Sequence, residues 1–171
     1  FPSDVKSEDD KPLLSWRVAI LPFMEELELY EQFHLDEPWD SPHNVKLLGQ
    51  MPEVYSHPAY ATAPGTTVYQ RPAGEQFLNR PSAPVRMRDV IDGTANTIMA
   101  VETIADESVE WTKPADIEID PSDPLQGVID GQRQGFNALL SDGAVLFLNR
   151  DLDPEAFQAM LTRAGKEIVN P

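Results

Sequence analysis

Alternating acidic side chains between residues 115 and 124 carry the clearest cofactor chemistry in this sequence. The loop ADIEIDPSDP supplies carboxylates at Asp116, Glu118, Asp120 and Asp123 and a hydroxyl at Ser122. Hard divalent cations take oxygen ligands of this kind from irregular loops. The spacing differs from an EF-hand loop, because the Gly and the final Glu are missing. Asp116, Asp120 and Asp123 are therefore calcium candidates, and a solvated acidic loop is the alternative.

The sequence contains no catalytic motif among those that short patterns reveal. Its imidazoles are His34, His43 and His57, and they form no HExxH or comparable metal-binding pair. The serines lack a G-x-S-x-G elbow, and neither a P-loop nor a G-x-G-x-x-G fingerprint occurs. A glycosidase-type carboxylate pair depends on a spatial separation that the sequence does not give. We therefore predict no catalytic residue and expect a protein that is not an enzyme.

Two Asp-Gly pairs and two nearby polar residues have structural as well as functional interpretations. Asp92-Gly93 and Asp142-Gly143 are typical of turns, because Gly adopts positive φ and an Asp side chain can hydrogen-bond the backbone two residues on. Asn96 is expected to be a buried polar anchor for loop amides. Glu102 lies in an apolar run, so it either faces solvent or is paired internally. Only a buried carboxylate with a raised pKa would be a catalytic candidate.

The tryptophans are the remaining candidates for ligand contact. Trp16, Trp39 and Trp111 offer large apolar rings with a polar N–H. Core packing is the favoured interpretation for each ring, and a sugar-stacking platform is the alternative.

The acidic charge balance excludes one class of partner. Thirteen Lys and Arg stand against 29 Asp and Glu, which gives a formal net charge of −16. Nucleic-acid binding needs a basic patch that neutralises phosphates, and the sequence has no such cluster. Anionic membrane surfaces are disfavoured for the same reason. The absence of Cys also excludes disulfides, thiolate zinc sites and a Cys nucleophile.

The elements that position these residues begin with a helix-period pattern between residues 14 and 44. Trp16, Ile20, Phe23, Leu27 and Tyr30 recur at steps of three and four, which predicts a helix with one apolar face docked on a core. Ser15 is expected to cap this helix, and Pro22 is expected to kink it or restart it. A second, short helix is expected to begin at Ser41-Pro42 and run through Leu48.

The remaining chain is predicted to contain strands, a long loop region and one last helix. Residues 51–55 are expected to enter a strand, and residues 57–84 to be mostly loop with one edge strand at 66–69. Residues 96–104 predict a buried strand, and residues 136–148 predict a hairpin around Ser-Asp-Gly. A last helix should begin at Asp153-Pro154 and end at Gly165. The side chains expected on its buried face are Ala156, Phe157, Met160, Leu161 and Ala164.

Three separated motifs stand out along the chain. The first comprises LSWRVAILPFMEELELYEQF, LDEPWDSPHN and MPEVY, and it is the most specific of the three. The second comprises DGTANTI, Val101-Glu102 and WTKPAD, and the third comprises DGAV, Phe147 and LTRAGKE. Together they resemble one family, the pilin-like domain of unknown function 1559 that is expanded in planctomycete bacteria. Gln132 stands where a common family pattern has His, so the resemblance carries no metal role to this position. Ala95 and Ala144 each replace a family Ser.

This resemblance implies a fold and a cellular location. It implies an α+β, pilin-like, loop- and proline-rich single domain over residues 1–171, with N-terminal helices, a small antiparallel sheet and a C-terminal helix. A prepilin-type leader and hydrophobic helix would lie upstream of Phe1. The chain would then be an extracytoplasmic head at the cell surface or in the periplasm, tethered to the membrane only through that helix. Some pseudopilins hold calcium in a late loop, which supports the calcium candidates.

Two functions from different classes follow as hypotheses. In the first, the domain is a pilin- or pseudopilin-like structural head that self-assembles or assembles with other pilin-like subunits. This hypothesis predicts that Phe1 lies beside the sheet, where an upstream helix could join. In the second, the domain binds a carbohydrate or small solute through Trp and Asn side chains. That hypothesis requires exposed tryptophan rings.

Overall fold

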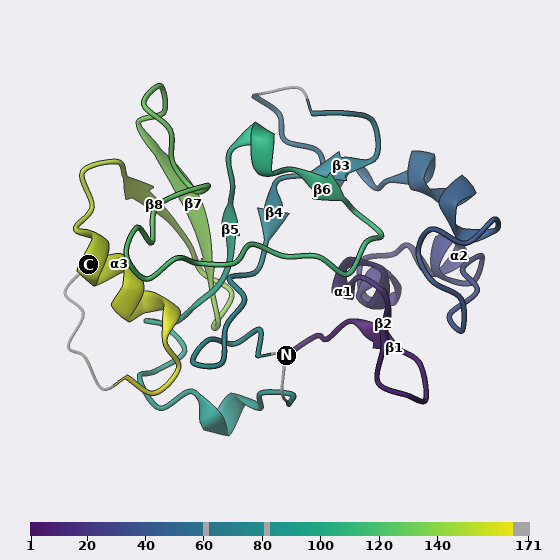
Figure 1. The fold of residues 1–171 in the computed structure, drawn as a ribbon, viewed down its shortest axis with the longest axis horizontal. Coiled ribbons are helices and arrows are strands. Elements are labelled where there is room, and N and C mark those ends of the chain that lie inside the picture. Colours follow the sequence, from purple (N-terminus) through teal and green to yellow (C-terminus); the bar gives the residue numbers. More distant parts are fainter. Residues whose placement is uncertain (60–61, 81–82, 166–171) are drawn as a thin grey trace. The chain divides into compact units, whose positions relative to one another are not determined.

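Short elements alternate with long loops throughout the computed structural model, which describes residues 1–59, 62–80 and 83–165 (Figure 1). The last two residues of LTRAGKE and parts of the predicted loop 57–84 lie outside these ranges. The architecture is α+β with antiparallel sheets, as predicted. The chain divides into two compact units, one with Tyr69–Glu107, Asp116–Pro171 and Phe1, and the other with Pro2–Val68 and Ser108–Ala115. The single domain stays a prediction.

The larger unit contains a four-stranded antiparallel sheet with the order β4-β5-β7-β8. Its strands are β4 (Tyr69–Gln70), β5 (Ile98–Glu102), β7 (Gly135–Leu140) and β8 (Val145–Asn149). The buried strand predicted at 96–104 is confirmed as β5, and the predicted hairpin is confirmed as β7–β8. Gly143 has φ 93°, and the Asp142 carboxylate accepts from the backbone N–H of Ala144, so this pair forms the turn.

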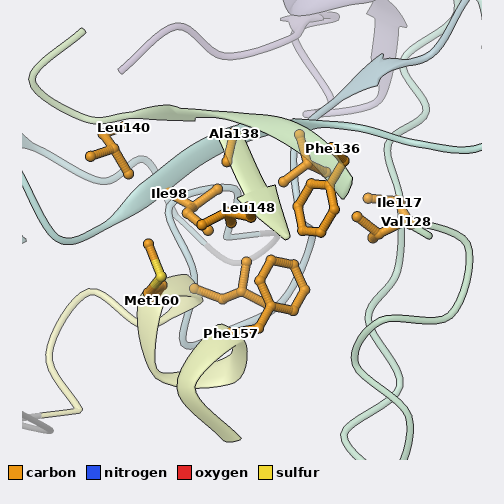
Figure 2. Close-up of a cluster of buried hydrophobic side chains, with 11 residues drawn as sticks. Ile98, Ile117, Val128, Phe136, Ala138, Leu140, Leu148, Phe157 and Met160 are labelled. Atoms are coloured by element: carbon orange, nitrogen blue, oxygen red, sulfur yellow. The ribbon is translucent and has the colours of Figure 1, made fainter. Parts of the chain in front are cut away.

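Helix α3 (Pro154–Leu161) covers one face of this sheet (Figure 2). The Asp153 carboxylate accepts from the backbone N–H of Glu155, and Pro154 occupies the first turn, as predicted. Phe157 and Met160 point toward Phe136, Ile98 and Leu148 of the strands. The buried hydrophobic cluster around this interface consists of Ile98, Val101, Ile117, Val128, Phe136, Ala138, Leu140, Leu148, Phe157, Met160 and Leu161.

The predicted end of α3 at Gly165 is wrong, because the helix ends at Leu161 and Thr162 is already extended. The carbonyl of Arg163 accepts from the backbone N–H of Ile91 at 2.7 Å, and its own N–H donates to the carbonyl of Gln76. These tertiary hydrogen bonds draw the chain out of the helix before the glycine. Ala164 is therefore exposed and not part of the buried face.

Two short helical connections complete the larger unit. They are η4 (Met87–Asp89) and η5 (Ala105–Glu107), both single 3-10 turns. The first of them lies in the segment that joins β4 to β5.

The smaller unit is built from short helical turns around one buried cluster. It contains the antiparallel pair β1 (Val5–Lys6) and β2 (Pro12–Leu14), and the pair β3 (Thr66–Thr67) and β6 (Val109–Glu110). Its helical turns are α1 (Trp16–Ala19), η1 (Leu21–Phe23), α2 (Leu27–Tyr30), η2 (Asn44–Gln50) and η3 (Glu53–Tyr55). The cluster that they cover consists of Leu14, Val18, Leu21, Leu29, Phe33, Leu47, Tyr55 and Trp111.

The opening helix is capped and interrupted as predicted, but its buried face is not the predicted one. The Ser15 hydroxyl accepts from the backbone N–H of Arg17, and Pro22 begins a new 3-10 turn. Since each helical turn restarts at its own angle, the periodicity does not persist across the interruptions. Trp16 is buried as predicted, whereas Phe23 and Leu27 face solvent. Besides Trp16, the buried apolar positions of this segment are Leu14, Val18, Leu21, Leu29 and Phe33.

Three local predictions in residues 41–70 also need correction. The short helix begins at Asn44 and not at Pro42, although the Ser41 hydroxyl does accept from the backbone N–H of Asn44. The predicted strand entry at residues 51–55 is wrong: Glu53–Tyr55 form the 3-10 turn η3, because the Tyr55 N–H bonds back to the Pro52 carbonyl. The single edge strand at 66–69 is two strands, β3 and β4, which pair with different sheets.

The structure contains no membrane-spanning candidate: among the described residues, no helix has the length and apolar character that crossing a bilayer requires.

Candidate functional site

The surface formed by η1 and α2 presents large apolar side chains to solvent. Phe23 is 87% exposed and Leu27 is 50% exposed, although Leu21 and Leu29 beside them are buried. The turn between η1 and α2 places Glu25 at φ 63°, in the left-handed region that costs a non-Gly residue about 1–2 kcal/mol. Backbone strain of this kind gathers at functional segments. We call Phe23, Leu27 and this turn the Phe23 surface.

Negative charge surrounds the Phe23 surface. Glu25, Glu26, Glu28 and Glu31 lie within the same nine residues as Phe23, and no Lys or Arg occurs among them. A large exposed apolar group with a charged rim is typical of a contact site, because an isolated soluble domain gains nothing by exposing it. The chemistry favours a partner with an apolar surface and basic neighbours.

The loop that follows α2 is closed by one buried amide. The side-chain oxygen of Asn44 accepts from the backbone N–H of His34 at 3.0 Å. Its Nδ2 donates to the carbonyls of His34, Glu37 and Pro38 at 2.9, 3.2 and 3.1 Å. Asn44 is fully buried, so every polar atom of its side chain has a backbone partner where water is absent. Asn44 is the last residue of the motif LDEPWDSPHN, but nothing in that motif marks it as the residue that closes the loop.

Two imidazole rings stack on the outside of this loop. The ring centroids of His34 and His43 are 3.5 Å apart, and the ring planes differ by 3°. The Nδ1 of His34 lies 3.0 Å from an oxygen of Glu37, and the Nε2 of His43 lies 2.8 Å from the carbonyl of Gln32. Among the described residues, no group of three His, Cys, Asp or Glu side chains is placed to hold a metal ion.

The Glu37 carboxylate gives this loop a pH dependence. Hydrogen bonds from Ser41 and His34 lower the pKa of Glu37 below its ordinary value of 4.5. A depressed pKa stabilises the folded loop at pH values above the unfolded-state value, and this stabilisation is lost as the pH falls through the folded-state value. We expect Glu37→Gln to lower the unfolding temperature at pH 7 and to have a diminishing effect below pH 4.5. Thermal unfolding of the wild-type protein and the variant across this pH range measures the difference in unfolding temperature. A difference that stays constant at all pH values would contradict the lowered pKa of Glu37.

The predicted calcium candidates do not converge in the structure. The Asp116 carboxylate is buried and binds the Arg71 side chain at 2.7 and 2.9 Å and the backbone N–H of Arg71 at 2.9 Å. Asp120 instead accepts from the hydroxyl and backbone N–H of Ser122, which lowers the pKa of Asp120. Asp123 is exposed. Calcium binding stays a prediction, and Asp116 is engaged elsewhere in this structure.

Glu102 is buried. Of the two alternatives for this residue, exposure to solvent or internal pairing, the structure shows internal pairing. One carboxylate oxygen accepts from the Asn137 side chain at 2.9 Å, and the other accepts from the Asn137 backbone N–H at 2.9 Å. Arg133 lies 3.5 Å from the second oxygen. Burial, and secondarily the charge of Glu102, raises the pKa of Tyr69. These contacts join β5 to β7 across the sheet and give Glu102 a structural role.

The Asp92-Gly93 pair of the second motif forms a turn that is hydrogen-bonded to Gly165, in the segment after α3. Gly93 has φ 95°, and the Asp92 carboxylate accepts from the Gly165 N–H at 2.7 Å. Asn96 is exposed and bonds only within its turn, to the Asp92 carbonyl, so the expectation of a buried anchor is wrong. The neighbouring Thr97 is the buried residue, because the strand β5 begins directly after it.

The tryptophans are mainly packing residues. Trp111 is fully buried, its Nε1 donates to the Leu48 carbonyl at 2.9 Å, and its ring contacts Phe33 and Tyr55. Trp16 is also buried. Trp39 is half-buried, and the ammonium of Lys113 lies 5.4 Å from its ring centroid. Only Trp39 retains an accessible part of a ring.

Comparison with known proteins identifies one family. A family model described as protein of unknown function (DUF1559) matches residues 1–73 and residues 49–133. The matched residues include the Phe23 surface, the loop closed by Asn44, and β5. No curated protein and no solved structure matches the chain.

Proposed function

This chain belongs to the DUF1559 family, and from that membership we propose that it is the extracytoplasmic head of a pilin- or pseudopilin-like protein that acts by assembly at the cell surface. The antiparallel sheet with one covering C-terminal helix is compatible with such a head. In this proposal, a hydrophobic helix upstream of Phe1 tethers the head, and contacts between subunits build the assembly. The proposal assigns no catalytic residue.

The position of Phe1 is the observation that carries this proposal. The backbone nitrogen of Phe1 lies 3.4 Å from the Val85 carbonyl oxygen. Phe1 and Met99 pack against the same buried cluster of Leu78, Val85 and Val90. Met99 belongs to β5, so this cluster lies against a strand of the four-stranded sheet. A chain that enters at Phe1 therefore enters beside the sheet, as a pilin-like tether requires.

Two exposed apolar side chains lie close in sequence to this cluster. Met87 and Ile91 are both exposed, and they lie three residues before and one residue after Val90, which is buried in the cluster that Phe1 packs against. Their exposure leaves apolar surface beside Val90. An upstream hydrophobic helix would cover such a surface and gain the free energy of its burial, about 25 cal/mol per Å².

The Phe23 surface supplies the contact between subunits in this proposal. It lies in the unit that does not contain the sheet, in the segment that resembles the family most specifically. Phe23 is attached to a well-packed base, since Leu21 and Leu29 on either side are buried. An aromatic side chain on a rigid base is a typical anchor of a protein interface, because little conformational entropy is lost when it binds.

We expect the double replacement Phe23→Ser and Leu27→Ser to abolish assembly while it changes the free energy of unfolding by less than about 0.5 kcal/mol. Chemical cross-linking of the full-length protein in its own cells measures assembly, and denaturant unfolding of residues 1–171 measures stability. Val54→Ser is the control, because Val54 is also an exposed apolar residue of the same unit. Undiminished cross-linked multimers in the double variant would contradict the role of this surface.

The alternative hypothesis, a carbohydrate- or solute-binding module, has less support. Trp16 and Trp111 are buried in the core and offer no open ring face for stacking. Stacking would depend on Trp39, which Lys113 partly occupies. No observation favours a ligand of this class.

A further inference from the structure

The strand β8 ends the four-stranded sheet and carries an unpaired edge within the described part of the chain. The order β4-β5-β7-β8 gives β8 one neighbour, β7 (Figure 1). The Leu140 N–H donates to the Ala144 carbonyl and the Arg150 N–H donates to the Gln134 carbonyl, both at 2.8 Å. Because these bonds alternate along an antiparallel pair, the backbone groups of Val145, Phe147 and Asn149 point away from β7. At the end of the strand, the Asn149 carbonyl accepts from the backbone N–H of Leu152 at 3.0 Å.

This edge lacks the usual protection against pairing. Natural edge strands are blocked by Pro, by Lys, by bulges or by inward-pointing charges. Residues 144–149, AVLFLN, contain no Pro and no charge, and the β7–β8 register is continuous over five residue pairs. Val145 is 63% exposed and Phe147 is 60% exposed, on the face opposite the buried Leu148. The edge is therefore open, apolar and long enough for another strand.

The ring of Phe147 is held in place before any partner arrives. A Cβ added to Gly135 would lie 2.7 Å from the ring of Phe147, so this ring covers the bare backbone of β7. A side chain fixed in this way loses little entropy when it is buried by a partner.

We propose that β8 pairs antiparallel with β8 of a second copy of this chain, around a two-fold axis at Phe147. Asp142 precedes the strand and Arg150 follows it, and both are exposed. In this arrangement Arg150 lies opposite residue 144 of the second copy and within diagonal reach of its Asp142. A parallel arrangement would instead place like charges together. Charge complementarity thus selects a second copy in one orientation, and Phe147 meets its own symmetry mate.

The biological meaning of this inference rests on the proposed function. The inference deepens that function because it names one partner, a second copy of this chain, and one contact of the assembly, the edge of β8. The contact is separate from the Phe23 surface and from the entry point at Phe1. It also predicts that the association is specific, since a net charge of −16 on each copy opposes association in general.

Analytical ultracentrifugation of residues 1–171 tests the pairing, from about 10 μM to about 1 mM, where small interfaces associate. We expect a monomer–dimer equilibrium and an increase of the Kd by at least about 10-fold in Phe147→Lys, because a charge then lies at the two-fold axis. Val54→Lys, at an exposed residue of the other unit, should leave the Kd unchanged. Circular dichroism of each variant shows that the fold is kept.

A charge exchange makes the test independent of Phe147. Asp142→Arg and Arg150→Asp should each weaken self-association, because Arg then meets Arg or Asp meets Asp across the axis. An equimolar mixture of the two variants should dimerise again, since both cross-axis pairs become opposite in sign. A monomer at every concentration, a dimer that tolerates Phe147→Lys, or a mixture no stronger than its components would overturn the inference. None of these results would bear on the tether at Phe1, which is tested in cells.

Discussion

Replacing Asp116 by alanine is expected to lower the free energy of unfolding by about 3–5 kcal/mol. The Asp116 carboxylate accepts from both the backbone and the side chain of Arg71 and from Asn79. The side chains of the ion pair are 7% and 4% exposed. Removing the carboxylate deprives the buried guanidinium of the Asp116 charge, and less of the desolvation penalty of the guanidinium is then offset.

Denaturant unfolding monitored by circular dichroism measures this effect. Asp123→Ala is the matched control, because Asp123 belongs to the same acidic loop and is exposed, and its effect should be within about 0.5 kcal/mol. The double replacement Arg71→Met and Asp116→Leu should recover only part of the loss. It removes the buried charge, but the backbone N–H of residue 71 and the Asn79 amide lose the acceptor that Asp116 supplied. A loss below about 1 kcal/mol in Asp116→Ala would show that the ion pair is not buried as described.

Replacing Trp111 by alanine is expected to cost about 3–5 kcal/mol in the smaller unit. The ring is fully buried, lies edge-on to Phe33 at 5.7 Å between centroids, and stacks on Tyr55 at 5.9 Å. Its backbone N–H also donates to the Gly65 carbonyl, beside the β3–β6 pair. Truncation would leave a large cavity in the centre of the cluster and an unpaired Leu48 carbonyl.

Two further variants separate packing from the hydrogen bond. Trp111→Phe keeps most of the ring volume but loses the N–H, so we expect an intermediate loss of about 1–3 kcal/mol. Trp39→Ala should cost less than Trp111→Ala, because the Trp39 ring is only half-buried where it packs against the same cluster. Equal losses in Trp39→Ala and Trp111→Ala would contradict the position of Trp111 at the centre of the core.

The features that could be predicted from the sequence are those that depend on a few neighbouring residues. Ser15 and Asp153 cap their helices through hydrogen bonds that span two residues. Asp142-Gly143 forms its turn because the required conformation is supplied within the hairpin. The strand β5 was recognisable from its apolar composition, and both sides of it are indeed occupied by other strands.

The features that could not be predicted depend on distant partners or on interrupted periodicity. The apolar pattern from Trp16 to Tyr30 predicts one buried helix face. The helical segments restart near Pro22 and Glu25, and these restarts turn Phe23 and Leu27 to the surface. The burial of Asp116 depends on Arg71, 45 residues away in the chain, so a predicted calcium ligand was found in an ion pair. Asn44 closes its loop through three carbonyls that no sequence motif marks.

These differences change the functional interpretation of the candidate residues. Glu102, Asp92 and Asp116, the polar candidates for a functional role in the sequence, have structural partners within their own unit. The apolar residues first considered for the core, Phe23 and Leu27, are the exposed ones. These exposed apolar side chains support the proposed role in assembly.

Labelling of a Glu28→Cys variant in intact cells tests the proposed function most directly, because it places a thiol beside the Phe23 surface and leaves Phe23 and Leu27 in place. These 171 residues contain no cysteine, and residue 28 is exposed, so the introduced thiol is the single reactive site in this part of the protein. The full-length variant is treated with a membrane-impermeant, thiol-specific cross-linker before and after lysis. An extracytoplasmic, assembling head predicts cross-linked multimers in intact cells. A thiol that reacts only after lysis, or that is labelled in intact cells but remains monomeric, would contradict the proposal.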